Sequence, residues 1–291
     1  MEKPVLEQKM TRYHVFPGIT LCFSTYVGDK CILPHEVHDG VMHINHCRQG
    51  RIGWKMKDDM TFYLGPGDLL LHMMDCCARS EMSFPYGYYQ GVSIEVDLYC
   101  LTENPPQILK EAGINGDQLY EKFFSNQGRP VAMAASDKIE HIFSELYDLP
   151  TTVRVPYFKL KVQELLLFLS IMEISKNVEI DRHLSAQTEI IREIHARITG
   201  QLNRRFTIDE LAREYLINTS TLKSVFKAVY GMPIASYMKH YRVNQGAKLL
   251  RETGDSIAVI AGKVGYENQS KFTKAFKDIY KVLPTEYRKQ F

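Results

Sequence analysis

Apolar residues in the last third of the chain repeat one helical pattern. Each copy begins with three apolar residues spaced i, i+3, i+4 on one helix face: Ile208, Leu211 and Ala212, and then Ile257, Ile260 and Ala261. The second set follows the first by 49 residues. Each copy continues with a further predicted helix, over 220–230 and 268–280, with Phe226 and Phe276 on the apolar side. The repeat therefore predicts two copies of one helical unit.

The second helix of each copy has a polar and basic outer side. Its residues are Ser220, Thr221, Lys223, Ser224 and Lys227 in the first copy, and Asn268, Gln269, Ser270, Lys271 and Lys274 in the second. Two helices joined by a short turn, the second one basic, describe a helix-turn-helix. Such a helix fits the DNA major groove, where Gln, Lys and Ser can bond base edges. Whether each residue reads a base or contacts only phosphate or water stays open.

Flanking residues complete a helical domain. Thr207 and Glu210 have the spacing of a capping box, which satisfies free N–H groups at a helix start. Residues 188–202 are predicted to form the first helix of the domain, and 236–252 a longer helix between the copies. We call the second helix of each copy, over 220–230 and 268–280, a reading helix. The longer helix sets the distance between the two reading helices, which must be about 34 Å to meet successive major grooves of straight DNA. A shorter distance requires bent DNA.

The second copy and the residues after it carry a more specific pattern. Its members are Ala258, Ala261, Gly262, Val264, Gly265 and Tyr266, then Ser270, Phe272, Phe276 and Lys277, then Pro284, Tyr287 and Arg288. In this spacing, about the last 100 residues resemble the AraC/XylS family of bacterial transcription regulators. Lys281 departs from the pattern, because the family usually has a glycine there that caps the helix in a left-handed conformation. The departure leaves the end of the second reading helix in question.

The resemblance implies a two-domain α+β protein. Residues 1–180 would form a cupin-like β-barrel or jelly roll with flanking helices, for effector sensing and dimerisation. Residues 188–291 would form an all-α DNA-binding domain with two helix-turn-helix motifs. The implied function is sequence-specific transcription regulation, more often activation than repression. The implied partners are double-stranded promoter DNA, RNA polymerase, a small-molecule effector and a second copy of the chain.

Charge is distributed unevenly between the two parts. From Glu189 to the end there are 18 Lys and Arg against 10 Asp and Glu, a net charge of +8. The whole chain has a net charge of +2, which leaves −6 for the first part. Only the C-terminal part is therefore suited to meet a polyanion.

The first 100 residues alternate short apolar runs with Gly, Pro and Asp, which indicates an antiparallel β-domain. Five strands are predicted, over 19–26, 41–46, 61–64, 68–72 and 91–96. Their spacing is typical of a small barrel or jelly roll. The Gly65-Pro66-Gly67 turn before the fourth strand resembles the second half of a cupin motif.

Helical periodicity follows, over 107–112, 117–124, 136–147 and 156–175, and Pro156 is predicted to open the last of these helices. The last of these has a wide apolar stripe, which either packs within its own domain or, as the resemblance implies, also contacts a second subunit. Both interpretations stay open. Residues 176–187 are polar and are predicted to be the interdomain linker.

Several histidines supply candidate chemistry in the N-terminal part. We expect an effector site lined by His35, His38, His46, Trp54 and His72. With His43, the histidines could instead hold a metal, which would make the chain a metal-dependent cupin enzyme fused to a DNA-binding domain. The family's His-x-His motif with a later Glu is missing, and no P-loop, dinucleotide fingerprint or nucleophile elbow is present. We therefore predict a regulator that has no cofactor or metal and is not an enzyme.

The cysteines and the hydropathy bear on the compartment. Six cysteines without a targeting segment indicate reduced thiols in a cytoplasm, and no apolar run is long enough to span a membrane. The adjacent Cys76 and Cys77 could sense oxidants or simply be small buried hydrophobes.

Overall fold

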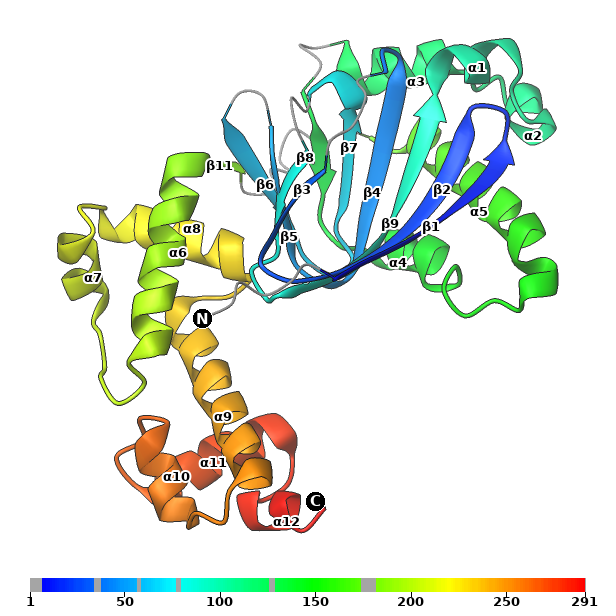
Figure 1. Ribbon diagram of the computed structural model, residues 1–291. Coiled ribbons are helices and arrows are strands. Elements are labelled where there is room, and N and C mark those ends of the chain that lie inside the picture. Colours follow the sequence, from blue (N-terminus) through cyan, green and yellow to red (C-terminus); the bar gives the residue numbers. More distant parts are fainter. Residues whose placement is uncertain are drawn as a thin grey trace. The chain divides into compact units, whose positions relative to one another are not determined.

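The computed structural model describes residues 7–33, 38–56, 59–76, 80–125, 129–173 and 182–290 (Figure 1). The chain divides into two compact units, Met1–Ser185 and Ala186–Phe291. The described strands belong to the first unit, and the second is helical. Each unit has a hydrophobic core of its own.

Two antiparallel sheets form the N-terminal unit. The larger has the strand order β1-β2-β9-β4-β7-β10, and the smaller has the order β11-β6-β5-β8-β3. The bounds are β1 Glu7–Phe16, β2 Ile19–Val27, β3 Lys30–Leu33, β4 Val41–Gly50, β5 Ile52–Lys55, β6 Met60–Leu64, β7 Leu69–Met73, β8 Ser80–Ser83, β9 Tyr88–Asp97, β10 Val131–Met133 and β11 Arg182–Leu184.

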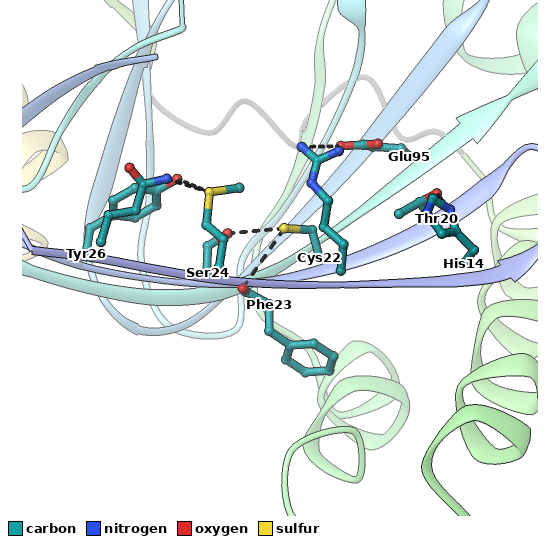
Figure 2. Close-up of polar contacts among 10 residues, drawn as sticks. His14, Thr20, Cys22, Phe23, Ser24, Tyr26 and Glu95 are labelled. Carbon is teal, nitrogen blue, oxygen red and sulfur yellow. Dashed lines mark hydrogen bonds and ion pairs between the residues drawn. The ribbon is translucent and has the colours of Figure 1, made fainter. Parts of the chain in front are cut away.

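Alternation of side chains along the strands separates two cores. In β2, Cys22, Ser24 and Tyr26 lie on one side of the strand and Phe23 lies on the other (Figure 2). Tyr26 belongs to a core between the sheets, to which both sheets contribute: Trp54, Phe62, Leu70, Met82, Phe84 and Tyr89 are among its members. Phe23 packs against the other core, on the helix side of the larger sheet. Strands β2, β4, β7, β9 and β10 of this sheet therefore present one face to each core.

Helices cover the outer face of the larger sheet. They are α1 Leu98–Glu103, α2 Gln107–Glu111, α3 Gly116–Phe124, α4 Asp137–Ser144 and α5 Thr151–Ile171, and a short 3-10 turn, Met74–Cys76, follows β7. Figure 1 shows α4 and α5 lying across one face of the sheet. Phe143 of α4 and Phe158 and Leu165 of α5 are fully buried there with Ile44 and Leu71 of the strands. The apolar face of α5 thus packs within its own unit.

The five predicted strands and the predicted helices over 107–112, 117–124 and 136–147 are confirmed with small shifts of their ends. The prediction that Pro156 opens the long helix is wrong, because the helix begins at Thr151 and Pro156 lies inside it. A proline in the second turn removes one hydrogen bond, and Pro156 is exposed, so its ring has room. The N-terminal unit is rich in sheet as expected, and its cupin jelly roll stays a prediction.

The predicted linker over 176–187 needs correction. Its first part lies outside the described residues, but Arg182–Leu184 forms β11, whose backbone pairs with β6. The next helix, α6 Ser185–Gly200, follows without a gap. Pairing of backbone groups does not depend on apolar side chains, so a polar segment can be a strand.

The C-terminal unit consists of seven helices in the described residues: α6, α7 Ile208–Glu214, α8 Thr219–Tyr230, α9 Ile234–Glu252, α10 Ile257–Lys263, α11 Gln269–Tyr280 and α12 Pro284–Arg288. We call α7 and α8 the first lobe and α10 and α11 the second lobe. Helix α9 belongs to both. Tyr237, near its start, packs edge-on against Phe226 of the first lobe, and Val243 and Ala247 enter the core of the second lobe with Phe272.

Left-handed residues end corresponding helices in the two lobes. After α7 and α10 these are Leu216, with φ of 53°, and Gly265, with φ of 81°. After α8 and α11 they are Gly231, with φ of 71°, and Lys281, with φ of 64°. Lys281 thus takes the conformation usual for glycine, and its N–H still bonds the Lys277 carbonyl oxygen at 2.9 Å. The end of α11 is therefore intact despite the departure from the family pattern.

Replacement of either strained residue by glycine is expected to stabilise the protein. Leu216→Gly and Lys281→Gly should each raise the free energy of unfolding by roughly 0.5–1 kcal/mol, because a left-handed L-residue costs about 1–2 kcal/mol and glycine returns part of this as chain entropy. The midpoint of denaturant unfolding measures the change. As a control, Lys277→Gly, inside α11, should lower the free energy of unfolding by about 1 kcal/mol. A Lys281→Gly protein less stable than the wild type would contradict the left-handed helix end.

Candidate nucleic-acid interface

Both reading helices begin in the same way. Asn218 precedes α8, and its Oδ1 accepts a hydrogen bond from Thr221 N at 2.7 Å. Asn268 precedes α11, and its Oδ1 accepts from Lys271 N at 2.9 Å. Each asparagine satisfies an N–H group that the helix itself leaves free. The capping box predicted at Thr207 and Glu210 is also confirmed at the start of α7.

The outer face of α8 is a row of exposed polar residues. Ser220, Lys223, Ser224 and Lys227 are spaced at 0, 3, 4 and 7 residues and are all exposed, whereas Thr221 is half-buried. The Ser220 hydroxyl donates to Asn218 Oδ1 at 2.7 Å. Within the described residues, Lys223 and Lys227 have no hydrogen bond or ion pair. Their ammonium groups can therefore meet an external acceptor without breaking an internal contact.

Helix α11 presents Gln269, Ser270 and Lys274 to solvent in the same manner. Two other predicted contact residues have structural partners. The Asn268 side chain is used as the cap, and Lys271 forms an ion pair with Glu267. The structure therefore places nine of the ten predicted DNA-contact residues on two helices and Asn268 at the cap of the second, and any base contact by them stays a prediction.

A close backbone contact braces the second lobe against the loop between α6 and α7. A Cβ atom placed on Gly265 would lie 1.9 Å from the Leu202 carbonyl oxygen. Beside this contact, Arg242 Nη2 donates to the Arg204 carbonyl oxygen at 3.1 Å. At the other end of α9, the Arg288 guanidinium donates to the carbonyl oxygens of Leu250 and Asp255, at 3.3 and 2.6 Å. The close approach at Gly265 and the hydrogen bonds of Arg288 give a structural role to two residues of the sequence pattern.

The sequence-based list of site residues omitted two arginines in this region. Arg205 and Arg242 lie next to the brace and line a cavity together with Tyr266. The sequence showed only a basic pair, Arg204 and Arg205, near the end of a helix, and gave no signal for Arg242 because it comes from another element.

The predicted effector residues do not converge on one place. His35 lies outside the described residues, and His38 is exposed just before β4. His46 of β4 points to the helix side of the larger sheet, where its ring stacks on Phe143 with centroids 4.1 Å apart. His46 is 2% exposed, and neither ring nitrogen has a hydrogen-bond partner in the described part of the chain. Burial lowers the pKa of His46 to about 4, so this imidazole is neutral.

His72 lies on the opposite face of the sheet from His46. Its Nε2 is 3.1 Å from Asn45 Nδ2, and its ring is 5.3 Å from that of His43. Trp54, on β5 of the smaller sheet, belongs to the core between the sheets and is 9% exposed. His43, which was assigned no effector role, joins His72 because β4 and β7 pair there in register. His72 and His43 therefore form a polar group that excludes His46.

A metal site and a membrane span are the alternatives to a DNA-binding and effector-binding protein. Over the described ranges, no three His, Cys, Asp or Glu side chains are placed to hold a metal ion together. Of the helices described, none is long and apolar enough to cross a membrane. Cys77 lies outside the described residues.

Comparison with known proteins places the helical unit among regulators. Residues 211–290 match a family model described as a helix-turn-helix domain. The chain is 33% identical over 107 residues to the transcriptional activator AarP of Providencia stuartii, covering 37% of this chain and 79% of AarP. It is 29% identical over 101 residues to the transcriptional activator RhaR of Mannheimia succiniciproducens, covering 35% of this chain but only 37% of RhaR.

Among solved structures, the chain is similar to a DNA-binding domain. The DNA-binding domain of AdpA, solved in complex with a target DNA, is 22% identical and matches with a TM-score of 0.33, covering 34% of this chain and 90% of that one.

The brace predicts a large effect of one methyl group. Gly265→Ala should lower the free energy of unfolding by roughly 2 kcal/mol or more, because the side chain meets a carbonyl oxygen and φ is positive. Gly262→Ala is the matched control, since nothing lies within 4 Å of the Cβ position of Gly262. This variant should raise the free energy of unfolding by up to about 1 kcal/mol, because alanine favours the helix more than glycine does. Thermal and denaturant unfolding measure both. Equal stability of the two variants would contradict the close contact.

Buried His46 predicts a pH-dependent stability. The unfolded chain binds the proton near pH 6.5 and the folded chain only near pH 4, so stability falls as the pH drops through this interval. The loss between pH 7 and 5 should be roughly 2 kcal/mol. His46→Phe keeps the stacking on Phe143 and should remove this part of the dependence, whereas His141→Gln, an exposed histidine on α4, should leave it. A pH dependence unchanged in His46→Phe would contradict the burial of a neutral ring.

Proposed function

The chain belongs to the AraC/XylS family of bacterial transcription regulators, and we propose that it binds promoter DNA through α8 and α11, as a dimer, under the control of a small molecule. It is a DNA-binding regulator. The contact residues, the effector, the dimer and the sign of regulation are the parts proposed. AarP and RhaR are named as activators, and we propose activation, in contact with RNA polymerase in the cytoplasm, for this chain as well.

The matched architecture of the two lobes carries the proposal. Both reading helices have an asparagine cap, an apolar inner face and an outer face of Ser, Gln and Lys. Lys223, Lys227 and Lys274 keep their ammonium groups exposed. A helix of this kind can enter a major groove, and its lysines can replace counterions on the phosphates. Helix α9, shared by both lobes, holds the two reading helices at a set separation.

Exposed apolar residues on α5 support a dimer. Val153, Leu160 and Ile171 are 47%, 57% and 80% exposed. Their separations of 7 and 11 residues place them on one face of a helix with 3.6 residues per turn. This face lies apart from the buried residues, such as Phe158 and Leu165. Pairing with a second α5 would remove the three side chains from water.

The polar group between the sheets supports an effector site. His43, Asn45 and His72 lie beside an aromatic core that includes Trp54 and Tyr89. Ligand sites commonly combine apolar walls with a few polar groups that orient the ligand. We therefore propose this face of the larger sheet, and not the surroundings of His46, as the place of an effector.

Selection of bound sequences from random duplex DNA by the full-length protein tests the DNA part of the proposal. We expect a motif with two half-sites about one helical turn apart, one for each reading helix. Lys223→Ala and Lys274→Ala should each weaken binding to the selected duplex, and a residue that reads a base should lose roughly 1–3 kcal/mol more on that duplex than on a scrambled one.

Lys248→Ala is the matched control, since Lys248 is exposed on α9 and belongs to neither reading helix. It should change the affinity little. Equal losses on selected and scrambled duplexes would reduce the two lysines to phosphate contacts. Absence of any selected motif, with or without candidate effectors, would argue against sequence-specific recognition.

A further inference from the structure

A cavity of about 450 Å³ lies within the helical unit, beside the brace between the second lobe and the loop that leads into α7. Its walls come from the end of α6, the loop that leads into α7, the first half of α9 and the turn before α11. All of these belong to one compact unit. The cavity is within the size range of small-molecule sites. It is separate from the outer faces of α8 and α11 and from the polar group between the sheets.

One side of the cavity is apolar. Ile198 and Leu211 are almost fully buried, at 2% and 1% exposed, and Met238 is 9% exposed. Phe206, Ile208 and Ile234 continue this wall and are half-buried. These six apolar side chains cannot form hydrogen bonds or ion pairs with a free ion or a phosphate group, but they can pack against a hydrocarbon chain or ring.

The other side carries positive charge. Arg205, Lys239 and Arg242 line it together with Tyr266. Lys239 is paired with Asp278, at 2.9 Å between Nζ and Oδ2. Within the described residues, neither Arg205 nor Arg242 forms an ion pair, although the charge of Arg205 also acts on the Glu267 carboxylate, which is paired with Lys271. Burial, and then the charge of Arg205, lower the pKa of Arg242. The two guanidinium groups therefore repel each other, and an anion between them would relieve this repulsion.

Arg242 also has an unused donor. Its Nη2 donates to the Arg204 carbonyl oxygen, but its Nε is buried and has no acceptor among the described residues. A buried donor without an acceptor costs free energy, and this Nε lies beside Gly265, 3.2 Å from its Cβ position. Guanidinium groups bind carboxylates with two parallel hydrogen bonds, so a carboxylate matches this site well.

We propose that this cavity binds an amphipathic organic anion, a carboxylate joined to an apolar chain or ring, with the carboxylate at Arg205 and Arg242 and the apolar body against Ile198, Leu211 and Met238. The DNA backbone is the competing source of an anion for the two arginines. The apolar wall favours the organic ligand, because a phosphodiester would leave that wall facing water.

Binding there has a consequence for DNA, which rests on the proposed function. The single negative charge of the ligand would offset one of the two arginine charges beside the turn that leads into α11, and the ligand would touch the loop that braces the second lobe. Both effects reduce the attraction for a polyanion. Carboxylate binding should therefore weaken the binding of duplex DNA.

Isothermal titration of the full-length protein with octanoate and with 1-naphthoate tests the site, and the two acids distinguish a chain from a ring. At least one should bind saturably, whereas 1-octanol, which lacks the charge, and acetate, which lacks the apolar body, should bind at least about tenfold more weakly. Arg205→Gln should weaken binding of the acid about tenfold, since it removes a charged partner. Arg205 is exposed and forms no internal bond that the structure describes, so the variant should fold normally.

Two further variants locate the ligand. Ala235→Trp places a large ring at the exposed rim of the cavity and should prevent binding without lowering the thermal midpoint. Lys248→Gln, on the outer side of α9, removes one positive charge elsewhere and should bind as the wild type does. Three results would overturn the proposal: failure of both acids to bind, binding of octanol as tight as that of the acids, or binding of the acid by Arg205→Gln and Ala235→Trp as tight as by the wild type.

Measurement of DNA binding with and without the acid shows whether the two arginines bind the organic carboxylate or the DNA backbone. Saturating acid, but not octanol, should weaken binding of a random-sequence duplex at least about fivefold. If neither acid binds and Arg205→Gln weakens the duplex and lowers its salt dependence, the arginines serve the DNA backbone and the proposal is wrong. Because the titration itself contains no DNA, failure of duplex binding would count against the proposed function and leave the cavity result standing.

Discussion

The contact between the Leu202 carbonyl oxygen and Gly265 determines how the two lobes are held on α9. Only a residue without a Cβ atom can approach this closely and also adopt a positive φ. Two reading helices can serve one DNA duplex only when their separation and tilt are set in advance. Helix α9 supplies the separation, and the contact at Gly265, with the Arg242 bond to the Arg204 carbonyl oxygen, restrains rotation of the second lobe about α9. The orientation of α11 depends on this restraint, and so does the cavity that lies beside it.

A similar constraint operates in the N-terminal unit, where the larger sheet has a core on each face. His46 and His72 are close along the sheet but face opposite cores, because successive residues of a strand alternate. An effector bound among His43, Asn45 and His72 would therefore lie on the face opposite α4 and α5. Any effect on those helices would have to pass through the strands, for example through His46, which packs between β4 and Phe143.

Prediction from the sequence succeeded where local periodicity decides the structure. The repeat gave both lobes, the capping box and the apolar faces, because a helix closes its hydrogen bonds within itself. Prediction from the sequence missed seven elements, because these depend on partners distant in the chain: β1, β3, β5, β8, β10, β11 and α1. The predicted start of the long helix at Pro156 was wrong, because proline is common at the first position of a helix but is also tolerated here in the second turn. The effector residues were grouped by their order in the chain, and the alternation of β4 and β7 then separated His46 from His72.

The sequence by itself determined the family, the two lobes and the exposed basic faces, because these follow from short-range spacing of residue types. Only the tertiary structure decided which residues from different elements meet. It joined Arg205 to Arg242 and Tyr266, placed Leu202 against Gly265, and paired His43 with His72. Lys281 illustrates the boundary between the two. Its identity argued against a left-handed helix end, yet the packing of α11 and α12 against α9 stabilises that end strongly enough to carry the strain of a side chain.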